Sequence, residues 1–376
     1  MKRLLLGAIA LISVILGIGS YVFSKKAPTP EAVISFIKEN PERASFHYIR
    51  NGKVEAASHS EQMMPLASAV KTILAIEYAK QSAEGKINPK ESIPLKELEK
   101  YYLPDLDGGA HPAWRKAIEQ SGAAKNDAVP LEEVAKGMVQ YSSNANTEYL
   151  IEKLGRDRLK QVLGELGLRH HEPIYPFVSS LLLPYEIMSS DYRGVSDKEA
   201  LPKVKEKMRS MSAEEWRGYA WRIHEKLSKD ASGSYKKQAQ IEKWYDGELD
   251  KMNSDRFPAA TAKEYAELMQ KINSRSYFSK EVQQYLHPVM EGIMQNPANQ
   301  QWLVHAGKKG GSTAYILTDA MYATDKQGAK TELAVFFNDL QSKESDELTA
   351  VLNEFELLLL RDEKFRQKVI EELKQK

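Results

Sequence analysis

The sequence predicts an α+β fold, in which strands from both ends of the chain form one antiparallel sheet and the middle of the chain forms helices. Near the N-terminus, the strand-like segments SFHYIR and KVEAA flank Asn51-Gly52, a strong signal for a two-residue hairpin turn. Near the C-terminus, three apolar or alternating segments predict three more strands: QWLVHAG (301–307), TAYILTDAMYAT (313–324) and KTELAVFFNDL (330–340). Because the connections between successive strands are short, we expect a five-stranded antiparallel sheet.

The first residues predict a segment that enters a membrane. Lys2 and Arg3 precede an uncharged run at 4–24, and Lys25-Lys26 closes it. A run of this length suffices for a helix across a bilayer, and the basic residues before it are typical of an export signal. Bulky residues at 21–23 stand where a signal peptidase requires small ones. We therefore expect residues 1–24 to be an uncleaved signal-anchor that holds the rest of the chain outside the cell membrane. A cleaved signal peptide, followed by secretion, is the alternative.

The next elements follow from local signals. Residues 25–43 read as a linker with a short helix at 31–39. After the hairpin, an apolar helical pattern runs from Leu66 to Gly85, where glycine ends it. Another helix begins after Pro130, a residue that suits the first turn of a helix.

The later helices lie in a charged part of the chain. A helical insertion covers about 185–256, and the spacings Ser196…Glu199 and Ser212…Glu215 predict capping boxes there. Thr261…Glu264 marks the start of a further helix, and one long helix from about Glu344 ends the chain. Together these elements predict one domain at 44–376, with a helical lobe at about 66–300.

Composition narrows the possible functions. The chain has no cysteine, which excludes a disulfide framework, a thiolate nucleophile and a cysteine zinc site. Its formal net charge is +1, so no bulk electrostatic field favours nucleic acid as a partner. The eight histidines are scattered without metal-ligand spacing. We therefore expect no metal, no cofactor and no nucleic-acid partner.

Three short motifs carry the candidate chemistry. They are Ser68-Ala69-Val70-Lys71, Ser142-Ser143-Asn144 and Lys309-Gly310-Gly311. Each is weak alone, since the spacing of the first also occurs at Ser35…Lys38 and at Ser234…Lys237. Their order and context separate them from chance: the first opens an apolar helix, the second lies at a helix end, and the third lies on a strand before the closing strands.

The first two motifs suggest nucleophilic catalysis. A serine hydroxyl needs a neighbouring base, and Ser68 and Lys71 share one face of a helix. Burial beside the positive charge of Lys309 would lower the pKa of Lys71 and let it act as that base. Ser142 can relay a proton to the leaving amine, and Asn144 can hold a substrate amide and orient Lys71.

The third motif suggests substrate binding. The N–H groups of Ser68, at a helix start, and of Ser312 would meet the developing oxyanion. Gly310 and Gly311 have no Cβ, so a substrate can approach that strand edge closely. Lys309, Ser312 and Thr313 would together bind a substrate carboxylate.

These three motifs, in this order, resemble those of the class A β-lactamase and penicillin-binding D-alanyl-D-alanine peptidase superfamily. The resemblance covers the chain from Ala44 to the C-terminus. It implies a β-lactamase/transpeptidase-like fold, with the five-stranded sheet flanked by terminal helices beside an all-helical lobe. It also implies a serine hydrolase that acts through an acyl-enzyme on Ser68, with a β-lactam or a D-alanyl peptide of peptidoglycan as substrate.

Two departures from the family pattern bear on the substrate. The stretch between the second and third motifs is longer than in compact class A enzymes. The Glu-x-x-Leu-Asn motif that positions the deacylating water there is reduced to Glu172-Pro173, with Pro176 at the place of the asparagine. Glu172 either activates water or is a solvent-facing loop carboxylate. No arginine follows on the strands after Gly311 to bind a carboxylate. These gaps favour a D-alanyl peptidase or a slow β-lactamase over an efficient one, and leave an esterase on the same scaffold open.

Two readings of another class stay open. One is a catalytically inactive domain that binds peptidoglycan or proteins at the cell surface, with the charged helices at 185–256 as its contact surface. The other is a membrane-anchored structural protein in which the motifs are coincidental. The first does not require Lys71, and the second predicts no reaction with β-lactams.

Overall fold

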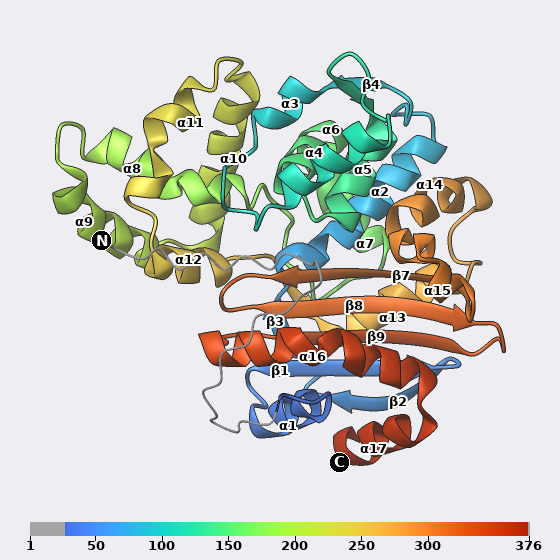
Figure 1. Ribbon diagram of the computed structural model, residues 1–376. Helices are drawn as coiled ribbons and strands as arrows, with labels where there is room; N and C mark the ends of the chain where they lie inside the picture. The colour runs from blue at the N-terminus through green and yellow to red at the C-terminus, as the bar shows by residue number, and fades with distance from the viewer. Residues whose placement is uncertain (1–26, 375–376) are drawn as a thin grey trace, which may run out of the picture.

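The computed structural model describes residues 27–374, and within them the chain forms a sheet layer and a large helical lobe stacked on one edge of the sheet (Figure 1). The predicted α+β class is confirmed. The expected membrane segment at 4–24 lies outside the described residues. Among the residues described, no helix combines the length and the apolar character needed to cross a bilayer.

The main sheet has five antiparallel strands, as predicted, in the order β2-β1-β9-β8-β7. Their bounds are β1 Ala44–Arg50, β2 Lys53–Ser58, β7 Leu303–Ser312, β8 Leu317–Asp325 and β9 Lys330–Phe337. The β1–β2 turn has Asn51 and Gly52 at φ 51° and 79°, the left-handed values that a tight hairpin requires. Strand β7 is an edge strand that faces the helical lobe (Figure 1).

Helices cover both faces of the sheet. On one face lie α1 Glu31–Glu39, α16 Ser342–Arg361 and α17 Glu363–Leu373, which form an apolar core with the strands. On the other face lies α13 Ala262–Asn273, which packs against β8, β9 and β1. The helix predicted at 31–39 as part of a linker is therefore an integral part of the sheet layer.

The helical lobe is built around α2 Lys71–Ala83, whose side chains are almost all buried. It is surrounded by α5 Leu131–Gln140, α6 Asn144–Leu154, α7 Arg156–Glu165 and α14 Lys280–Met290. Smaller elements complete the lobe: β3 Met63–Pro65, β4 Ser92–Pro94, α3 Leu95–Glu99, α4 Ala110–Gln120, β5 Ala128–Pro130, β6 Ala259–Thr261 and α15 Pro297–Gln300.

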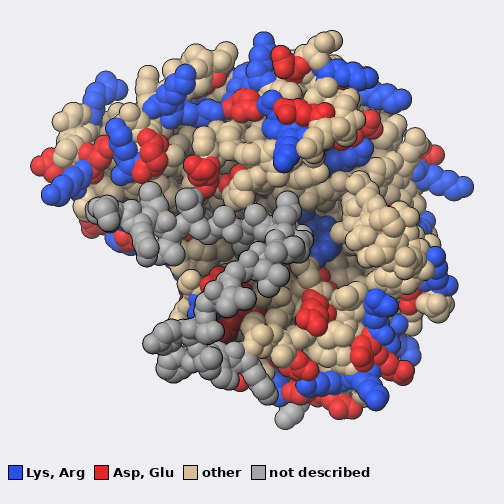
Figure 2. Space-filling model, in the orientation of Figure 1, with Lys and Arg blue, Asp and Glu red and all other residues tan. Residues whose placement is uncertain are grey.

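The charged stretch forms a group of inserted helices at one side of the lobe (Figure 1). They are α8 Leu183–Asp191, α9 Asp197–Ser210, α10 Ala213–Lys229, α11 Ser234–Ala239 and α12 Gly247–Ser254. They bury their own apolar side chains, among them Trp216 and Ile223. On the face shown in Figure 2, basic and acidic side chains are interspersed over these helices, as expected for solvated helical faces.

Three local predictions need correction. The strand expected from 313 begins at Leu317, because the hydroxyl of Thr313 accepts the N–H groups of Tyr315 and Ile316 and so forms a turn. The single long C-terminal helix is two helices, since Asp362 leaves the helical conformation and caps α17 through Phe365 N. Ser196 makes no side-chain cap, whereas the predicted capping box at Ser212 and the Thr261 cap are both present.

Candidate active site

Ser68 lies in a tight turn between β3 and α2. The turn is one 3₁₀ segment, Ala67–Val70, that leads directly into α2. Ala67 is buried and holds a left-handed φ of 44°, a strained conformation for a residue with a Cβ that is found mostly at functional sites. Ser68 is partly exposed, and among residues 27–374 its hydroxyl makes no hydrogen bond. The hydroxyl is therefore free to meet a substrate.

Lys71, the first residue of α2, is fully buried and points to the start of α6. Its amine lies 2.7 Å from the carbonyl oxygen of Ser142, 2.9 Å from Oδ1 of Asn144 and 3.3 Å from the hydroxyl of Ser142. The loop between α5 and α6 makes this possible, because Ser142 adopts a left-handed φ of 66° and Ser143 caps α6 by accepting the N–H of Asn146. The structure thus brings the first two motifs together.

Lys309 on β7 reaches the same point from the sheet. Its amine donates to the hydroxyl of Ser142 at 3.0 Å and to the carbonyl oxygen of Gly310 at 2.6 Å. The Ser142 hydroxyl therefore lies between two lysine amines, one from each side of the site. The third motif converges with the other two, as its position on the strand before the closing strands predicted.

Both lysines have perturbed pKa values. Burial, together with the positive charge of Lys309, lowers the pKa of Lys71 well below its usual range. Burial also lowers the pKa of Lys309 to about 8, against the opposing effect of Asp319. Burial therefore favours the uncharged form of Lys71, while Lys309, with its pKa at about 8, is mostly charged at neutral pH.

The Lys71 amine donates to three oxygens: the carbonyl and the hydroxyl of Ser142 and Oδ1 of Asn144. The Ser142 hydroxyl oxygen also accepts from Lys309, so hydrogen bonds through Ser142 join the two lysines. Once Lys71 loses a proton, its lone pair can instead accept the hydroxyl hydrogen of Ser142.

The backbone of β7 packs directly on the turn that holds Ser68. A Cβ added to Gly311 would lie 2.4 Å from the Ser68 nitrogen and 2.7 Å from the Leu66 oxygen, distances that no side chain tolerates. The hydroxyl of Thr318 on β8 donates to the same Leu66 oxygen at 2.8 Å. Glycine at 311 is therefore required for the close approach of strand and turn.

A profile of the β-lactamase enzyme family matches residues 30–353 of the chain, most of its length.

The chain belongs to the β-lactamase enzyme family.

Solved structures with the same fold are similar to this β-lactamase-family protein. The TLA-1 extended-spectrum β-lactamase is 14% identical, with 92% of this chain and 97% of that chain covered and a TM-score of 0.50. A β-lactamase from Chitinophaga pinensis is 16% identical, with 85% and 94% covered and a TM-score of 0.50. The TLA-3 extended-spectrum β-lactamase is 12% identical, with 91% and 96% covered and a TM-score of 0.50. At these identities the likeness shows the fold. No curated protein matches the chain in sequence.

Two of the sequence-predicted residues of this β-lactamase-family protein lie in other surroundings. The Glu172 carboxylate accepts the N–H of Ala259 at 3.3 Å and, among residues 27–374, makes no hydrogen bond to Ser68, Lys71 or Ser142. The hydroxyl of Thr313 is used in its own turn and in a 2.9 Å hydrogen bond with Ser254. Among the described residues, neither side chain makes a hydrogen bond to Lys71 or Lys309.

Other site residues take the predicted places. Asn144 contacts Lys71, Gly310 and Gly311 lie on the β7 edge, and Ser312 is the exposed last residue of β7. Among the described residues, no group of three His, Cys, Asp or Glu side chains is arranged to hold a metal ion.

A buried charged cluster, which sequence patterns did not reveal, supports α6. Glu148, one turn after Asn144, accepts from Val178 N at 2.9 Å and from the Ser179 hydroxyl. His224 of α10 lies 2.8 Å from this carboxylate and 3.1 Å from that of Glu152. Although burial opposes its charge, these two carboxylates raise the pKa of His224 to about 9. The i+4 spacing from Asn144 was a usable signal for Glu148, but nothing local points to His224, 76 positions away.

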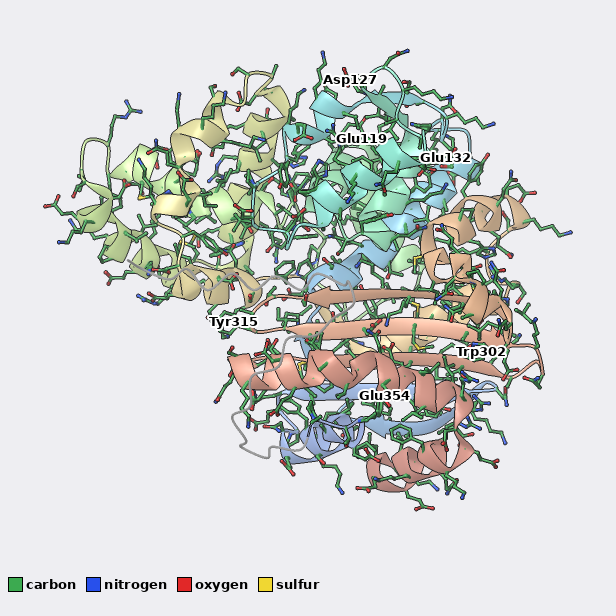
Figure 3. All side chains as sticks on the ribbon, in the orientation of Figure 1. Glu119, Asp127, Glu132, Trp302, Tyr315 and Glu354 are labelled. Atoms are coloured by element: carbon green, nitrogen blue, oxygen red, sulfur yellow. The ribbon has the colours of Figure 1, made fainter. Side chains whose placement is uncertain are left out.

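The inserted helices contact both sides of the site. On the helical side, Lys236 of α11 donates to the carbonyl oxygens of Glu99 and, at 2.9 Å, of Tyr102. On the sheet side, the Tyr315 hydroxyl donates to the carbonyl of Gly247 on α12 at 2.9 Å. Figure 3 shows Tyr315 at the end of the sheet beside these helices. The inserted helices therefore connect the helical side of the site to its sheet side.

Replacement of Lys236 by methionine is expected to loosen the segment 99–107 without removing the chemistry. That segment ends at Asp107, which caps α4 by accepting the N–H of His111 at 2.9 Å. Loss of two hydrogen bonds from a charged, half-buried amine should lower stability by about 1–3 kcal/mol. Thermal unfolding and amide hydrogen exchange of 99–107 measure this. Lys237→Met, on the exposed side of the same helix, is the matched control, and equal effects of the two changes would contradict the prediction.

Proposed function

We propose that this protein is a serine hydrolase that forms an acyl-enzyme on Ser68 with β-lactams and with D-alanyl peptides of peptidoglycan. The observation that carries the proposal is the Ser142 hydroxyl held between the amines of Lys71 and Lys309, with Ser68 three residues before Lys71 on the turn against which β7 packs. A binding module has no need for a buried lysine whose pKa is lowered in this way. Membership of the β-lactamase enzyme family supports the same chemistry.

Each of these groups has a defined role in acylation. Uncharged Lys71 takes the Ser68 proton as the serine oxygen attacks the carbonyl carbon. The N–H groups of Ser68 and Ser312 bind the oxyanion that forms. When the C–N bond breaks, the Ser142 hydroxyl gives its proton to the leaving nitrogen and regains one from Lys71. Atoms and protons balance, and Lys71 ends uncharged.

Lys309 is the candidate carboxylate-binding group. A charged amine has three N–H groups, and two are used by Ser142 and Gly310. The third is available for the carboxylate that β-lactams and D-alanyl peptides share. The exposed hydroxyl of Ser312, next to it on β7, is a second donor.

We propose slow deacylation. Glu172 accepts the N–H of Ala259 and, within residues 27–374, makes no hydrogen bond to Ser68, Lys71, Ser142 or Lys309, so it is not held in place to activate a hydrolytic water. This favours a D-alanyl peptidase or a slow β-lactamase over a rapid one. An anchor at residues 4–24 would hold such an enzyme at the outer face of the membrane, where peptidoglycan lies.

Acylation is expected to fall above about pH 8. Lys309, with its pKa lowered to about 8, loses its charge there and no longer attracts a substrate carboxylate. The second-order rate constant for acylation by benzylpenicillin should then decrease about tenfold per pH unit. Stopped-flow measurements across this range, with circular dichroism at each pH as a check on folding, test it. A rate that stays constant to about pH 9.5 would contradict the assignment of Lys309.

The test of the function itself is intact-mass spectrometry of the full-length protein over time with benzylpenicillin. A mass increase of one penicillin that persists for hours supports a peptidase-like enzyme. A transient increase with released penicilloate supports a β-lactamase. Absence of any adduct with benzylpenicillin, a cephalosporin and a D-alanyl-D-alanine peptide would overturn the proposal in favour of a binding module.

A further inference from the structure

A second charged cluster lies behind the site, between the sheet and α16. Lys308 is the neighbour of Lys309 on β7 but points to the opposite face. Its amine lies 2.6 Å from Oδ2 of Asp319 on β8, 2.6 Å from Oε2 of Glu356 on α16 and 3.0 Å from Oδ1 of Asn353. Asp319 and Glu356 are only 5% and 4% exposed. One partly exposed cation therefore faces two buried carboxyl groups.

Each carboxyl group has one oxygen without a partner. Asp319 Oδ1 and Glu356 Oε1 are buried, and neither has a hydrogen-bond partner among the described residues. The other oxygen of each carboxyl group lies 2.6 Å from the same Lys308 amine, so the two side chains are neighbours, but two carboxylates have no hydrogen to share. A proton held by one of them would provide a donor that the other can accept, and would leave the cluster with one positive and one negative charge.

We propose that Asp319 and Glu356 share one proton at neutral pH, and that this Lys308–Asp319–Glu356 cluster is a positioning group that sets the charge behind Lys309. The catalytic consequence rests on the function proposed above; the shared proton does not.

The electrostatics of the cluster agree with a retained proton. Burial and the neighbouring Asp319 raise the pKa of Glu356 to about 8, although Lys308 acts in the opposite direction. Two adjacent buried carboxyl groups resist ionising together. The pKa of Lys308 itself is raised, because the two acids outweigh its burial.

Within residues 27–374, Lys308 and Asp319 are the charged groups that act on Glu356. The neighbouring side chains of β7 and β8 in the same core are apolar, such as Ala306, Leu317 and Met321. Elsewhere on α16, Glu344 pairs with Arg43, and Arg366 of α17 donates to the carbonyls of Leu359 and Leu360. The charge of the cluster is therefore set by its own three members.

The cluster is close enough to the site to affect it. Asp319 pairs with Gly310 in the sheet, and a Cβ on Gly310 would lie 3.3 Å from Oδ2 of Asp319. Asp319 raises the pKa of Lys309 and Lys308 lowers it. When Glu356 loses its proton, the added negative charge holds the proton on Lys309 to higher pH. The shared proton thus couples the ionisation of Glu356 to that of Lys309, which lies on the opposite face of β7.

The first test is infrared difference spectroscopy on wild type and Glu356→Gln. Wild type should show the C=O stretch of a protonated carboxyl group at neutral pH, and the band should disappear as the pH rises through about 8. The band should be absent from Glu356→Gln and retained in Glu354→Gln, a matched control at the exposed residue labelled on α16 in Figure 3. A wild-type spectrum without a band assignable to Glu356, or loss of the band in Glu354→Gln, would overturn the shared proton.

The second test reads the coupling to the site. Glu356→Gln keeps a hydrogen-bond donor toward Asp319, so it should fold and acylate normally at neutral pH. Its alkaline decline in acylation should begin several tenths of a pH unit earlier than that of wild type, because the additional negative charge never forms. An unchanged pH profile would refute the link to Lys309. Absence of acylation in wild type would instead count against the proposed function and leave the infrared result standing.

Stability gives a readout that does not need activity. The pKa of Glu356 rises from 4.5 to about 8 on folding, so the folded protein holds a proton that the unfolded chain releases between these pH values. The contribution of Glu356 to stability is complete below about pH 4.5 and decreases as the pH rises to about 8. Glu356→Gln should remove this component of the pH dependence of unfolding, and Glu354→Gln should not. Identical profiles for all three proteins would also contradict the proposal.

Discussion

Ser68→Ala is expected to abolish acylation by benzylpenicillin, with a loss of at least about 10³-fold that leaves no detectable adduct. The nucleophile is the one group whose role nothing else in the site can take, since Ser142 is held between two amines and Ser143 caps α6. Because Ser68 is partly exposed and its hydroxyl makes no hydrogen bond within the described residues, the change should leave stability nearly unaltered. Intact-mass spectrometry and thermal unfolding measure the two quantities.

The chain offers matched controls for that experiment. Ser35 and Ser234 have lysine at the same spacing, on α1 and at the start of α11. Ser35→Ala and Ser234→Ala should acylate like wild type, because within residues 27–374 neither serine hydroxyl makes a hydrogen bond to a lysine amine. Adduct formation in Ser68→Ala, or its loss in either control, would show that another residue carries the acyl group.

Gly311→Ala is expected to reduce acylation by about 10²–10³-fold while the fold persists. The new methyl group would meet the Ser68 nitrogen at 2.4 Å, so β7 and the Ser68 turn must separate. Separation moves the N–H groups of Ser68 and Ser312 apart, and the oxyanion needs both. Overpacking of this kind should also lower stability by about 1–3 kcal/mol.

Gly164→Ala is the control for that change. Gly164 lies within α7, and an added Cβ there meets nothing within 4 Å. Alanine at this position should leave acylation unchanged and is expected to stabilise the helix slightly. If Gly311→Ala acylated at the wild-type rate, the close packing of β7 on the Ser68 turn would have no role in catalysis.

The sequence predicted those parts of the fold that depend on neighbouring residues. Asn51-Gly52 predicted the hairpin turn because only a few residue types adopt its left-handed conformation. The motif order predicted that Ser68 and Lys71 converge with Ser142 and Lys309. Hydrogen bonds join Lys71, Ser142 and Lys309, whereas within the described residues none of them includes the Ser68 hydroxyl. Local signals were misleading where a single side chain changes the backbone, as Thr313 and Asp362 do.

Contacts between distant segments that carry no recognisable motif were beyond prediction. The buried pairs of Glu148 with His224 and of Lys308 with Glu356 join elements from different parts of the chain. Hydrophobic periodicity indicates which face of a helix is buried, but not which charged residue of another element packs against that face. Such pairs are specified by tertiary packing alone.

The bridging role of α8–α12 has a mechanical consequence. Lys236 of α11 binds the segment that leads to α4, and Gly247 of α12 accepts from the Tyr315 hydroxyl, three residues after Ser312. A displacement of α11 or α12 would therefore be transmitted to the helical side or the sheet side of the site. A molecule that binds the outer surface of these two helices is expected to act on both sides without touching Ser68.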